Sequence, residues 1–150
     1  MTMAIDQFSQ SLPMMLYRTL DAVMPRFRKI FNDFGLTEQQ WRVLRVLWER
    51  ESLTINRLAE LTLIPAPSLV GIVDRLERDE LVTRQRSQSD RRKVNVVLIA
   101  KGVALEHQVM PRVAKTYAQL KQSVDPAVWD RVLAGLQQIS TVEAPKPDRR

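Results

Sequence analysis

Residues 58–100 decide the fold, and they read LAELTLIPAPSLVGIVDRLERDELVTRQRSQSDRRKVNVVLIA. Apolar residues recur at helical spacing through 58–79, with an interruption at Pro65-Ala66-Pro67. Because proline ends one helix and suits the first turn of the next, we expect two short helices joined by a tight turn. The period then changes to two β-prone runs, 81–84 and 94–98, which predict a hairpin with a solvent-exposed polar tip.

Each of these expected helices has one apolar side. Thr54 can cap the amino end of the first helix, because its hydroxyl can accept a backbone N–H. The second helix runs from Ser68 to about Asp79, and its inner side carries Leu69, Ile72, Val73 and Leu76. Its other side is mostly small or polar and carries Ser68, Val70, Gly71, Asp74 and Arg75.

A long helical pattern precedes this segment. Residues 8–34 carry an apolar stripe at spacings of three and four, which predicts a long helix. We expect Pro25 to kink or locally break this helix and Gly35 to end it. Thr37-Glu38-Gln39-Gln40 then matches a capping box, so it predicts the start of another helix.

Helical patterns also follow the hairpin. Helical spacing returns at about Ala100, and Asp125-Pro126 supplies the cap and first turn of a last helix. Residues 143–150 lack large apolar side chains, so we expect a disordered tail there. The expected fold is therefore mainly α with a small β-hairpin.

The composition of the 150-residue chain excludes several classes of function. Cysteine is absent and histidine occurs once, which excludes disulfides, cysteine catalysis and clustered-histidine zinc sites. The 4 glycines are too scattered for a phosphate-binding loop, which argues against a nucleotide cofactor. Together with the cysteine and histidine counts, this leads us to expect no cofactor and no metal. There is no apolar run of membrane-spanning length, and residues 1–10 lack the basic start of a signal peptide. We therefore expect a cytoplasmic protein.

The formal charge is +6, and much of the surplus is local. Residues 81–93 carry five basic side chains and one acidic side chain, which are Arg84, Arg86, Arg91, Arg92 and Lys93 against Asp90. Such a cluster is either a solvated loop or an element that contacts phosphates.

Two short helices followed by a basic hairpin predict a winged helix-turn-helix, here residues 36–99. The second helix can enter a DNA major groove, because Ser68, Gly71 and Arg75 leave room or offer polar groups on its outer side. Arginines on a thin hairpin can reach the neighbouring minor groove, and Asp90 can orient one of them through an ion pair. The alternative is an ordinary helical hairpin at 54–80.

The long flanking helices, residues 8–34 and 100–141, do not fit inside one small winged domain. Bundling both ends with a second copy of the chain would bury their apolar stripes, so we expect a dimerisation region and a homodimer. A twofold dimer also presents two recognition helices to a palindromic operator. The alternative is a bundle formed within one chain.

The segment from Leu36 to Gly102 resembles the MarR family of bacterial transcription regulators. The resemblance rests on LTEQQWRVLRVL at 36–47, LAELTLIPAPSLVGIVDRLERDELVTR at 58–84 and SDRRKVNVVLIAKG at 89–102. The last stretch contains the Asp-x-Arg wing pattern, here Asp90 and Arg92. TEQQWRVLR with LIPAPSL is similar to the branch of homoprotocatechuate and other aromatic-acid catabolic repressors.

The resemblance implies a role for each side chain expected at DNA. Ser68 and its helix neighbours Pro67 and Gly71 would face bases or phosphates, and Arg75 could contact either. Arg92 and its neighbour Arg91 would enter the minor groove, whereas Arg84 and Arg86 would meet phosphates.

Two positions depart from the family pattern. Glu80 replaces a frequent glycine, so it must either avoid a left-handed conformation or bear strain. Ile99-Ala100 lacks the usual threonine that caps the next helix.

Members of this family often release DNA when a small aromatic acid binds between the bundle and the winged domain. The resemblance therefore implies a ligand site, for which methionine and aromatic side chains are suitable walls. The candidate walls are Met14, Met15, Tyr17, Met24, Phe27, Trp41 and Met110. Arg18 is the first candidate cation for a carboxylate, followed by Arg45 and His107. The alternative for the apolar residues is a place in the core, and Arg18 could instead pair with Asp21 or Asp6.

Two other classes of function compete with a dimeric, ligand-released repressor. An enzyme would need an acid, base or nucleophile set, and Asp21, Glu106 and His107 do not form one convincingly. A winged-helix scaffold for protein interactions, without an effector, is the other alternative. Replacing Arg91 and Arg92 with alanine would separate the two, because only a DNA-binding protein needs them.

Overall fold

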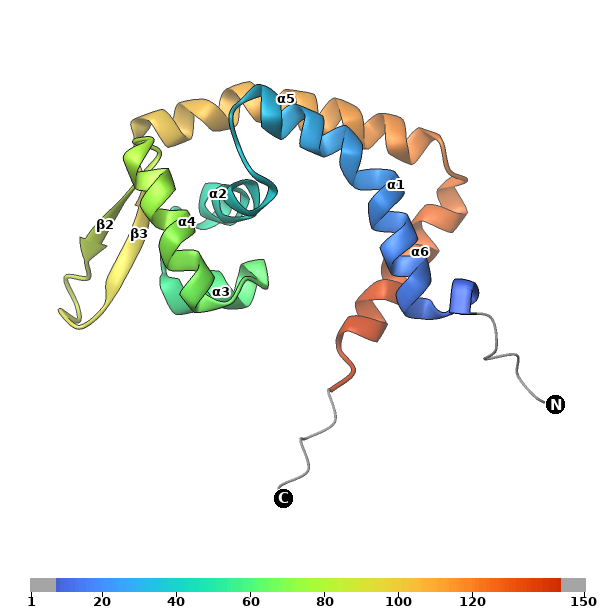
Figure 1. Ribbon diagram of the computed structural model, residues 1–150, viewed down its shortest axis with the longest axis horizontal. Coiled ribbons are helices and arrows are strands. Elements are labelled where there is room, and N and C mark those ends of the chain that lie inside the picture. The colour runs from blue at the N-terminus through green and yellow to red at the C-terminus, as the bar shows by residue number, and fades with distance from the viewer. Residues whose placement is uncertain (1–7, 144–150) are drawn as a thin grey trace, which may run out of the picture. The chain divides into compact units, whose positions relative to one another are not determined.

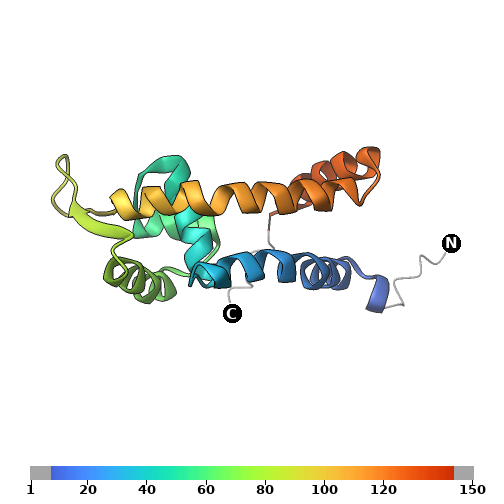
Figure 2. The same cartoon turned by 90° about the horizontal axis from the view of Figure 1, so that it is seen from above.

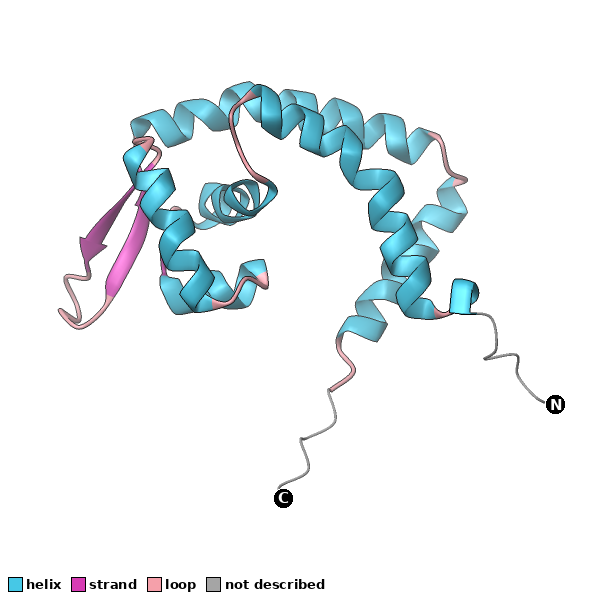
Figure 3. Cartoon of the chain, in the orientation of Figure 1, coloured by secondary structure: helices cyan, strands magenta, loops and turns pink. Residues whose placement is uncertain are grey.

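The computed structural model describes residues 8–143, which form helices and one small antiparallel sheet (Figures 1 and 3). The chain opens with a 3-10 turn, Phe8–Gln10, and the helices α1 (Leu12–Asp33) and α2 (Glu38–Arg50). Strand β1 (Ser52–Thr54) leads into α3 (Ile55–Thr62) and α4 (Ala66–Arg78). Strands β2 (Val82–Arg86) and β3 (Val94–Leu98) then form the hairpin. Two helices end the described chain, α5 (Ala100–Gln122) and α6 (Pro126–Ser140).

Polar caps fix three of the helix starts, as the sequence predicts. The Thr37 hydroxyl accepts the Gln40 N–H and the Gln40 side chain accepts the Thr37 N–H, which completes the capping box of α2. The Thr54 hydroxyl accepts the Arg57 N–H at the start of α3. The Asp125 carboxylate accepts the backbone N–H groups at the start of α6. Each cap pairs a donor that the first turn of a helix leaves without a partner.

Other boundaries differ from the expectation. Helix α1 begins at Leu12 rather than at Phe8, because the chain makes a separate 3-10 turn first. At Pro25 the expectation holds in its milder form, because the helix continues through the proline and the α1 ribbon bends along its length in Figure 1. The sheet has three strands rather than two, in the order β1-β3-β2, because Ser52–Thr54 pairs antiparallel with β3.

The core of the winged region forms where α2, α3 and α4 meet the sheet. All four inner residues predicted for α4 are buried, as are Leu44, Leu47 and Leu58 from α2 and α3 and Val82 and Val96 from the hairpin. This packing leaves Ser68, Gly71 and Arg75 on the outer face of α4 exposed. Both views show the hairpin projecting from the helices around it (Figures 1 and 2).

The chain divides into two compact units after Val113. The first unit holds α1 to α4, the sheet and the first part of α5, so α1 groups with the winged region inside one chain. The second unit holds the end of α5 and α6, where Tyr117 and Trp129 pack edge to face with ring centroids 5.4 Å apart. Of the tail expected to be disordered, 144–150 lies outside the described residues.

Large apolar side chains remain exposed on both flanking helical segments. Leu12, Leu16 and Leu20 of the predicted α1 stripe are exposed, whereas Phe27 and Ile30 are buried. On α6, Val128, Val132 and Leu133 are exposed as well. Within residues 8–143, no helix is long and apolar enough to cross a membrane.

Helices α1 and α4 end in the same hydrogen-bonded motif. After α1, the Gly35 N–H bonds to Asn32 and the Leu36 N–H to Phe31; after α4, the Glu80 N–H bonds to Glu77 and the Leu81 N–H to Leu76. The motif requires a left-handed residue, with φ of 68° at Gly35 and 61° at Glu80. Glu80 therefore bears the strain that the sequence left as one of two possibilities.

Candidate nucleic-acid interface and effector cavity

The outer face of α4 presents the side chains predicted for base contact. Pro67, Ser68, Gly71 and Arg75 are all exposed, and an added Cβ at Gly71 would meet no atom within 4 Å. The Pro65 carbonyl accepts the N–H groups of Ser68 and Leu69, so proline begins the helix as the sequence predicts. This end of α4 is therefore a small, open surface of the kind that a helix entering a major groove requires.

Hydrogen bonds shape the hairpin tip, residues 87–93. The Ser87 N–H donates to the Lys93 carbonyl at 2.9 Å, and the Lys93 N–H donates to the Asp90 carbonyl at 3.0 Å. The Asp90 carboxylate accepts the backbone N–H of Arg92 at 3.0 Å, and among residues 8–143 no ion pair joins it to an arginine. Asp90 thus sets the backbone of the turn rather than a guanidinium, which corrects the expected ion pair. Arg86, Arg91 and Arg92 are exposed.

Arg84 differs from the other arginines of the hairpin. Its guanidinium donates to Glu77 Oε2 at 2.6 Å and to Asp74 Oδ1 at 2.7 Å, and its backbone N–H donates to Glu77 Oε1 at 3.2 Å. The Val70 carbonyl accepts a further, longer bond at 3.4 Å. The side chain that was expected to meet phosphates is thus directed along α4, because two carboxylates on that helix compete for it.

The surroundings of Arg84 keep it charged. Partial burial acts to lower the pKa of its guanidinium, but the hydrogen bonds and charges of Asp74 and Glu77 outweigh burial and raise the pKa. The group is therefore a permanent cation matched by two anions.

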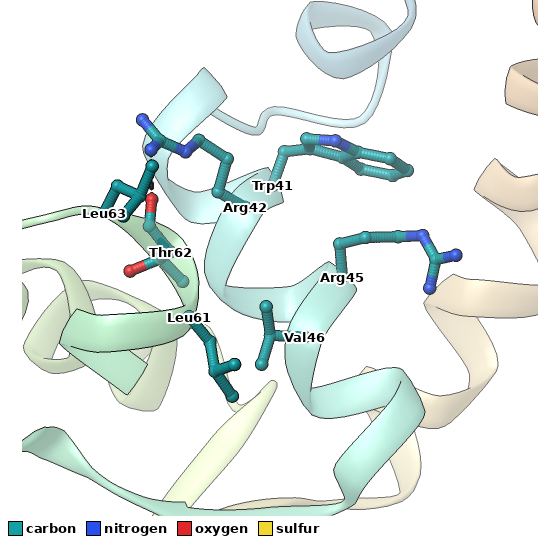
Figure 4. Close-up of a pocket in the computed structure, with 7 residues that line it drawn as sticks. All are labelled: Trp41, Arg42, Arg45, Val46, Leu61, Thr62 and Leu63. Atoms are coloured by element: carbon teal, nitrogen blue, oxygen red, sulfur yellow. Dashed lines mark hydrogen bonds between the residues drawn. The ribbon is translucent and has the colours of Figure 1, made fainter. Parts of the chain in front are cut away.

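A cavity of about 260 Å³ lies between α2 and the end of α3. Its walls are Trp41, Arg42, Arg45 and Val46 from α2, Leu61 and Thr62 from the end of α3, and Leu63 from the turn that leads to α4 (Figure 4). Trp41 is half-buried and stacks on Phe31, with ring centroids 4.6 Å apart. In Figure 4 the indole of Trp41 and the guanidinium of Arg45 extend to the same side of α2, whereas the guanidinium of Arg42 points the other way. An indole and a guanidinium on one side suit a flat anion.

The two arginines of this cavity have different partners. Arg45 pairs with Glu49 at 2.8 Å on the exposed side of α2, so its guanidinium can exchange that weak surface partner for another anion. Arg42 donates to the Thr62 carbonyl at the end of α3, next to the left-handed Leu63. A ligand that drew Arg42 away would therefore remove a hydrogen bond from the turn between α3 and α4.

Comparison with known proteins identifies the family of this chain. A family model described as MarR matches residues 36–94. The homoprotocatechuate degradative operon repressor of Escherichia coli is 39% identical over 111 residues, which are 74% of this chain and 75% of that protein. The chain belongs to the MarR family.

Further relatives agree with this assignment. The transcriptional regulator FarR of Neisseria gonorrhoeae is 36% identical over 107 residues, 71% of this chain and 73% of its own length. The crystal structure of NadR in complex with 4-hydroxyphenylacetate has a TM-score of 0.78 and 30% identity, and covers 94% of this chain and 100% of NadR. This MarR-family protein has the winged-helix fold of these regulators and is itself a transcriptional regulator, not an enzyme.

Most of the side chains predicted from the sequence for a ligand site do not line the cavity at Trp41 in this MarR-family structure. Trp41 and Arg45 line the cavity, whereas Phe27 is buried in the core. Met14, Met24 and Met110 are half-buried, and Tyr17, Arg18 and His107 are exposed, but none of them lines this cavity. Within residues 8–143, no three acidic or histidine side chains form a group that could hold a metal ion.

Sequence reasoning missed Arg42 and three residues at the end of α3 and the turn after it, Leu61, Thr62 and Leu63. Arg42 follows Trp41 directly, so its position on α2 was visible, but its carbonyl partner on another helix was not. It also missed Asp74 and Glu77 as partners of Arg84. Two acids three residues apart on a helix expected at DNA are a usable signal, because uncompensated anions there would repel phosphates.

Proposed function

We propose that this MarR-family regulator is a homodimeric repressor that binds a palindromic operator and leaves it when a small aromatic acid binds. Residues 36–99 would bind DNA, and residues 8–34 and 100–141 would form the dimer. The observation that carries the DNA-binding part is the pairing of an open α4 face with an exposed basic hairpin tip, Arg91-Arg92.

The two DNA-facing elements suit two different grooves. α4 offers small and polar groups from Pro67 to Arg75, which fit against base edges in a major groove. The tip offers exposed cations on a thin hairpin, which suits the narrow and electronegative minor groove. Arg86 lies lower on the same hairpin and is a candidate for a phosphate contact.

The exposed apolar side chains of α1 and α6 support a homodimer. Leu12, Leu16 and Leu20 form one stripe on α1, and each is at least 38% exposed in the single chain. A second copy that covered such stripes would remove apolar surface from water at about 25 cal/mol per Å². A twofold pair would also repeat the α4 and hairpin contacts on a palindrome.

The cavity at Trp41 supports a small aromatic acid as effector. A planar ring can stack against the indole, and a carboxylate can pair with Arg45, which extends to the same side. The relatives named for homoprotocatechuate degradation and the NadR complex with 4-hydroxyphenylacetate point to the same ligand class. Release requires that the ligand bind more tightly to a dimer whose recognition helices do not fit the operator.

A mobility-shift titration tests this proposal. The probe is DNA from the upstream region of the protein's own gene, titrated across a salt series with and without hydroxylated phenylacetic, benzoic and cinnamic acids. Specific, salt-dependent binding that one compound relieves supports the proposal. Binding that no compound relieves rejects the effector, and the absence of specific binding at low salt favours a protein-interaction scaffold.

A further inference from the structure

Arg84 binds a row of residues along one face of α4, the helix proposed to enter the major groove. Val70, Asp74 and Glu77 follow each other at spacings of four and three, so they share one face of α4 over about two helical turns. The Arg84 side chain contacts all three and is 28% exposed. One arginine therefore connects β2 to α4 along a large part of its length.

These contacts remove Arg84 from the cations that can bind DNA. Its charge is matched by two carboxylates at 2.6 and 2.7 Å, so the cluster of three side chains carries a net negative charge. A phosphate that approached Arg84 would also have to approach Asp74, which is half-exposed. Counterion release counts cations that neutralise phosphates, and a cation already neutralised does not contribute.

The same contacts fix the hairpin relative to α4. Arg84 lies in the middle of β2 and pairs with the buried Val96 of β3, so a restraint on Arg84 restrains both strands. The tip that carries Arg91 and Arg92 begins three residues after Arg84. A hairpin held at this point presents its tip at a set distance and angle from α4.

We propose that Arg84 is a positioning residue, which clamps the hairpin to the recognition helix so that both elements reach DNA together. The inference rests on the proposed DNA-binding function and adds a role for a side chain that touches no DNA. Arg86 provides a matched comparison, since it lies two residues along β2 on the same strand face. Within residues 8–143 no ion pair includes Arg86.

The test compares Arg84→Gln with Arg86→Gln by fluorescence-anisotropy titration of operator DNA across a salt series. We expect Arg84→Gln to lower the affinity for DNA about tenfold, which corresponds to the coupling energy usual between two residues in contact with each other. The slope of log K against log salt should stay unchanged. Arg86→Gln should flatten that slope by about 0.9, as the loss of one phosphate contact does. A flatter slope for Arg84→Gln would mean that Arg84 contacts phosphate, and this result would overturn the inference.

A double-substitution cycle with Arg92→Ala separates positioning from general stability. If Arg84 acts by placing the tip, then Arg84→Gln should cost much less affinity once Arg92 is absent. An equal loss in both backgrounds, accompanied by a lower melting temperature, would assign Arg84 a purely structural role and overturn the inference. No loss in either background would overturn it too.

Arg84→Lys covers the case in which the glutamine variant fails to fold. A lysine serves a phosphate well but cannot bridge two carboxylates with a planar fork. The clamp therefore predicts that Arg84→Lys loses most of the affinity that Arg84→Gln loses, at an unchanged slope. Full affinity in Arg84→Lys would overturn the clamp. If the unsubstituted protein does not bind specifically, the proposed function itself fails, and the inference fails with it.

Discussion

Among the four glycines, Gly102 is the one at which an added Cβ meets neighbouring atoms, so a methyl group there should destabilise the fold. A Cβ there would lie closer than 3.0 Å to the Leu81 carbonyl oxygen and 3.0 Å from Leu98 Cδ2. Neither side of this contact can withdraw freely. The Leu81 carbonyl accepts the Ile99 N–H, and the Gly102 carbonyl accepts the indole N–H of Trp48 at 3.0 Å.

The expected cost of Gly102→Ala follows from two opposing effects. Overpacking costs typically about 1–3 kcal/mol, and a contact against backbone belongs at the upper end of that range. Alanine returns up to about 1 kcal/mol of helix propensity. The net loss in the free energy of unfolding is therefore about 2 kcal/mol, or about 4–8 °C in melting temperature.

Thermal unfolding by circular dichroism, at one fixed protein concentration, measures this loss. Gly71→Ala is the matched control, because Gly71 also lies in a helix and its added Cβ would meet nothing within 4 Å. The control should gain about 0.5–1 kcal/mol of unfolding free energy. If Gly102→Ala melts at or above the parent temperature, α5 and Leu81 can separate at little cost, and the reasoning is refuted.

Three further predictions concern single side chains. Glu80→Gly should raise the unfolding free energy by up to about 1 kcal/mol, because glycine relieves the left-handed strain; urea titration checks this, and a loss of stability would contradict it. Thr37→Ala should lower the midpoint of the same titration by the equivalent of about 1 kcal/mol, whereas an unchanged midpoint would mean that the capping box contributes nothing. Trp41→Ala should leave operator affinity within about twofold but weaken an effector about tenfold or more, in line with a lost stacking partner. Calorimetric titration of the effector checks the last prediction, and unchanged ligand affinity would place the site elsewhere.

The sequence predicted those parts of the fold that local chemistry determines. Thr37, Thr54 and Asp125 cap their helices through neighbours within three residues, so the pattern of letters contains the whole interaction. Strand β1 was missed because three residues carry no readable period, and its partner β3 lies about forty residues further along the chain.

In the candidate site, too, the sequence predicted what depends on local composition and missed what depends on contacts between distant elements. The exposed arginines of the hairpin tip follow from charge and turn composition, and they are found exposed. Arg84 looks identical to them in the sequence, and only the approach of β2 to α4 gives it carboxylate partners. Arg18 is the first candidate for a ligand cation because it lies on the first long helix. The sequence pattern does not tell which side of that helix faces a cavity, and Arg18 is not among the residues that line the cavity at Trp41.

The contacts of Arg84 have a consequence for attempts to redirect such regulators to new operators. One way to redirect such a regulator is to graft the DNA-facing helix of one protein into another. In this protein such a graft would cut ion pairs, because Asp74 and Glu77 belong to α4 while Arg84, their partner, belongs to β2. A graft that replaced the two acids would leave Arg84 without its anions and the hairpin without its anchor. Positions 74, 77 and 84 would have to be transferred as one unit.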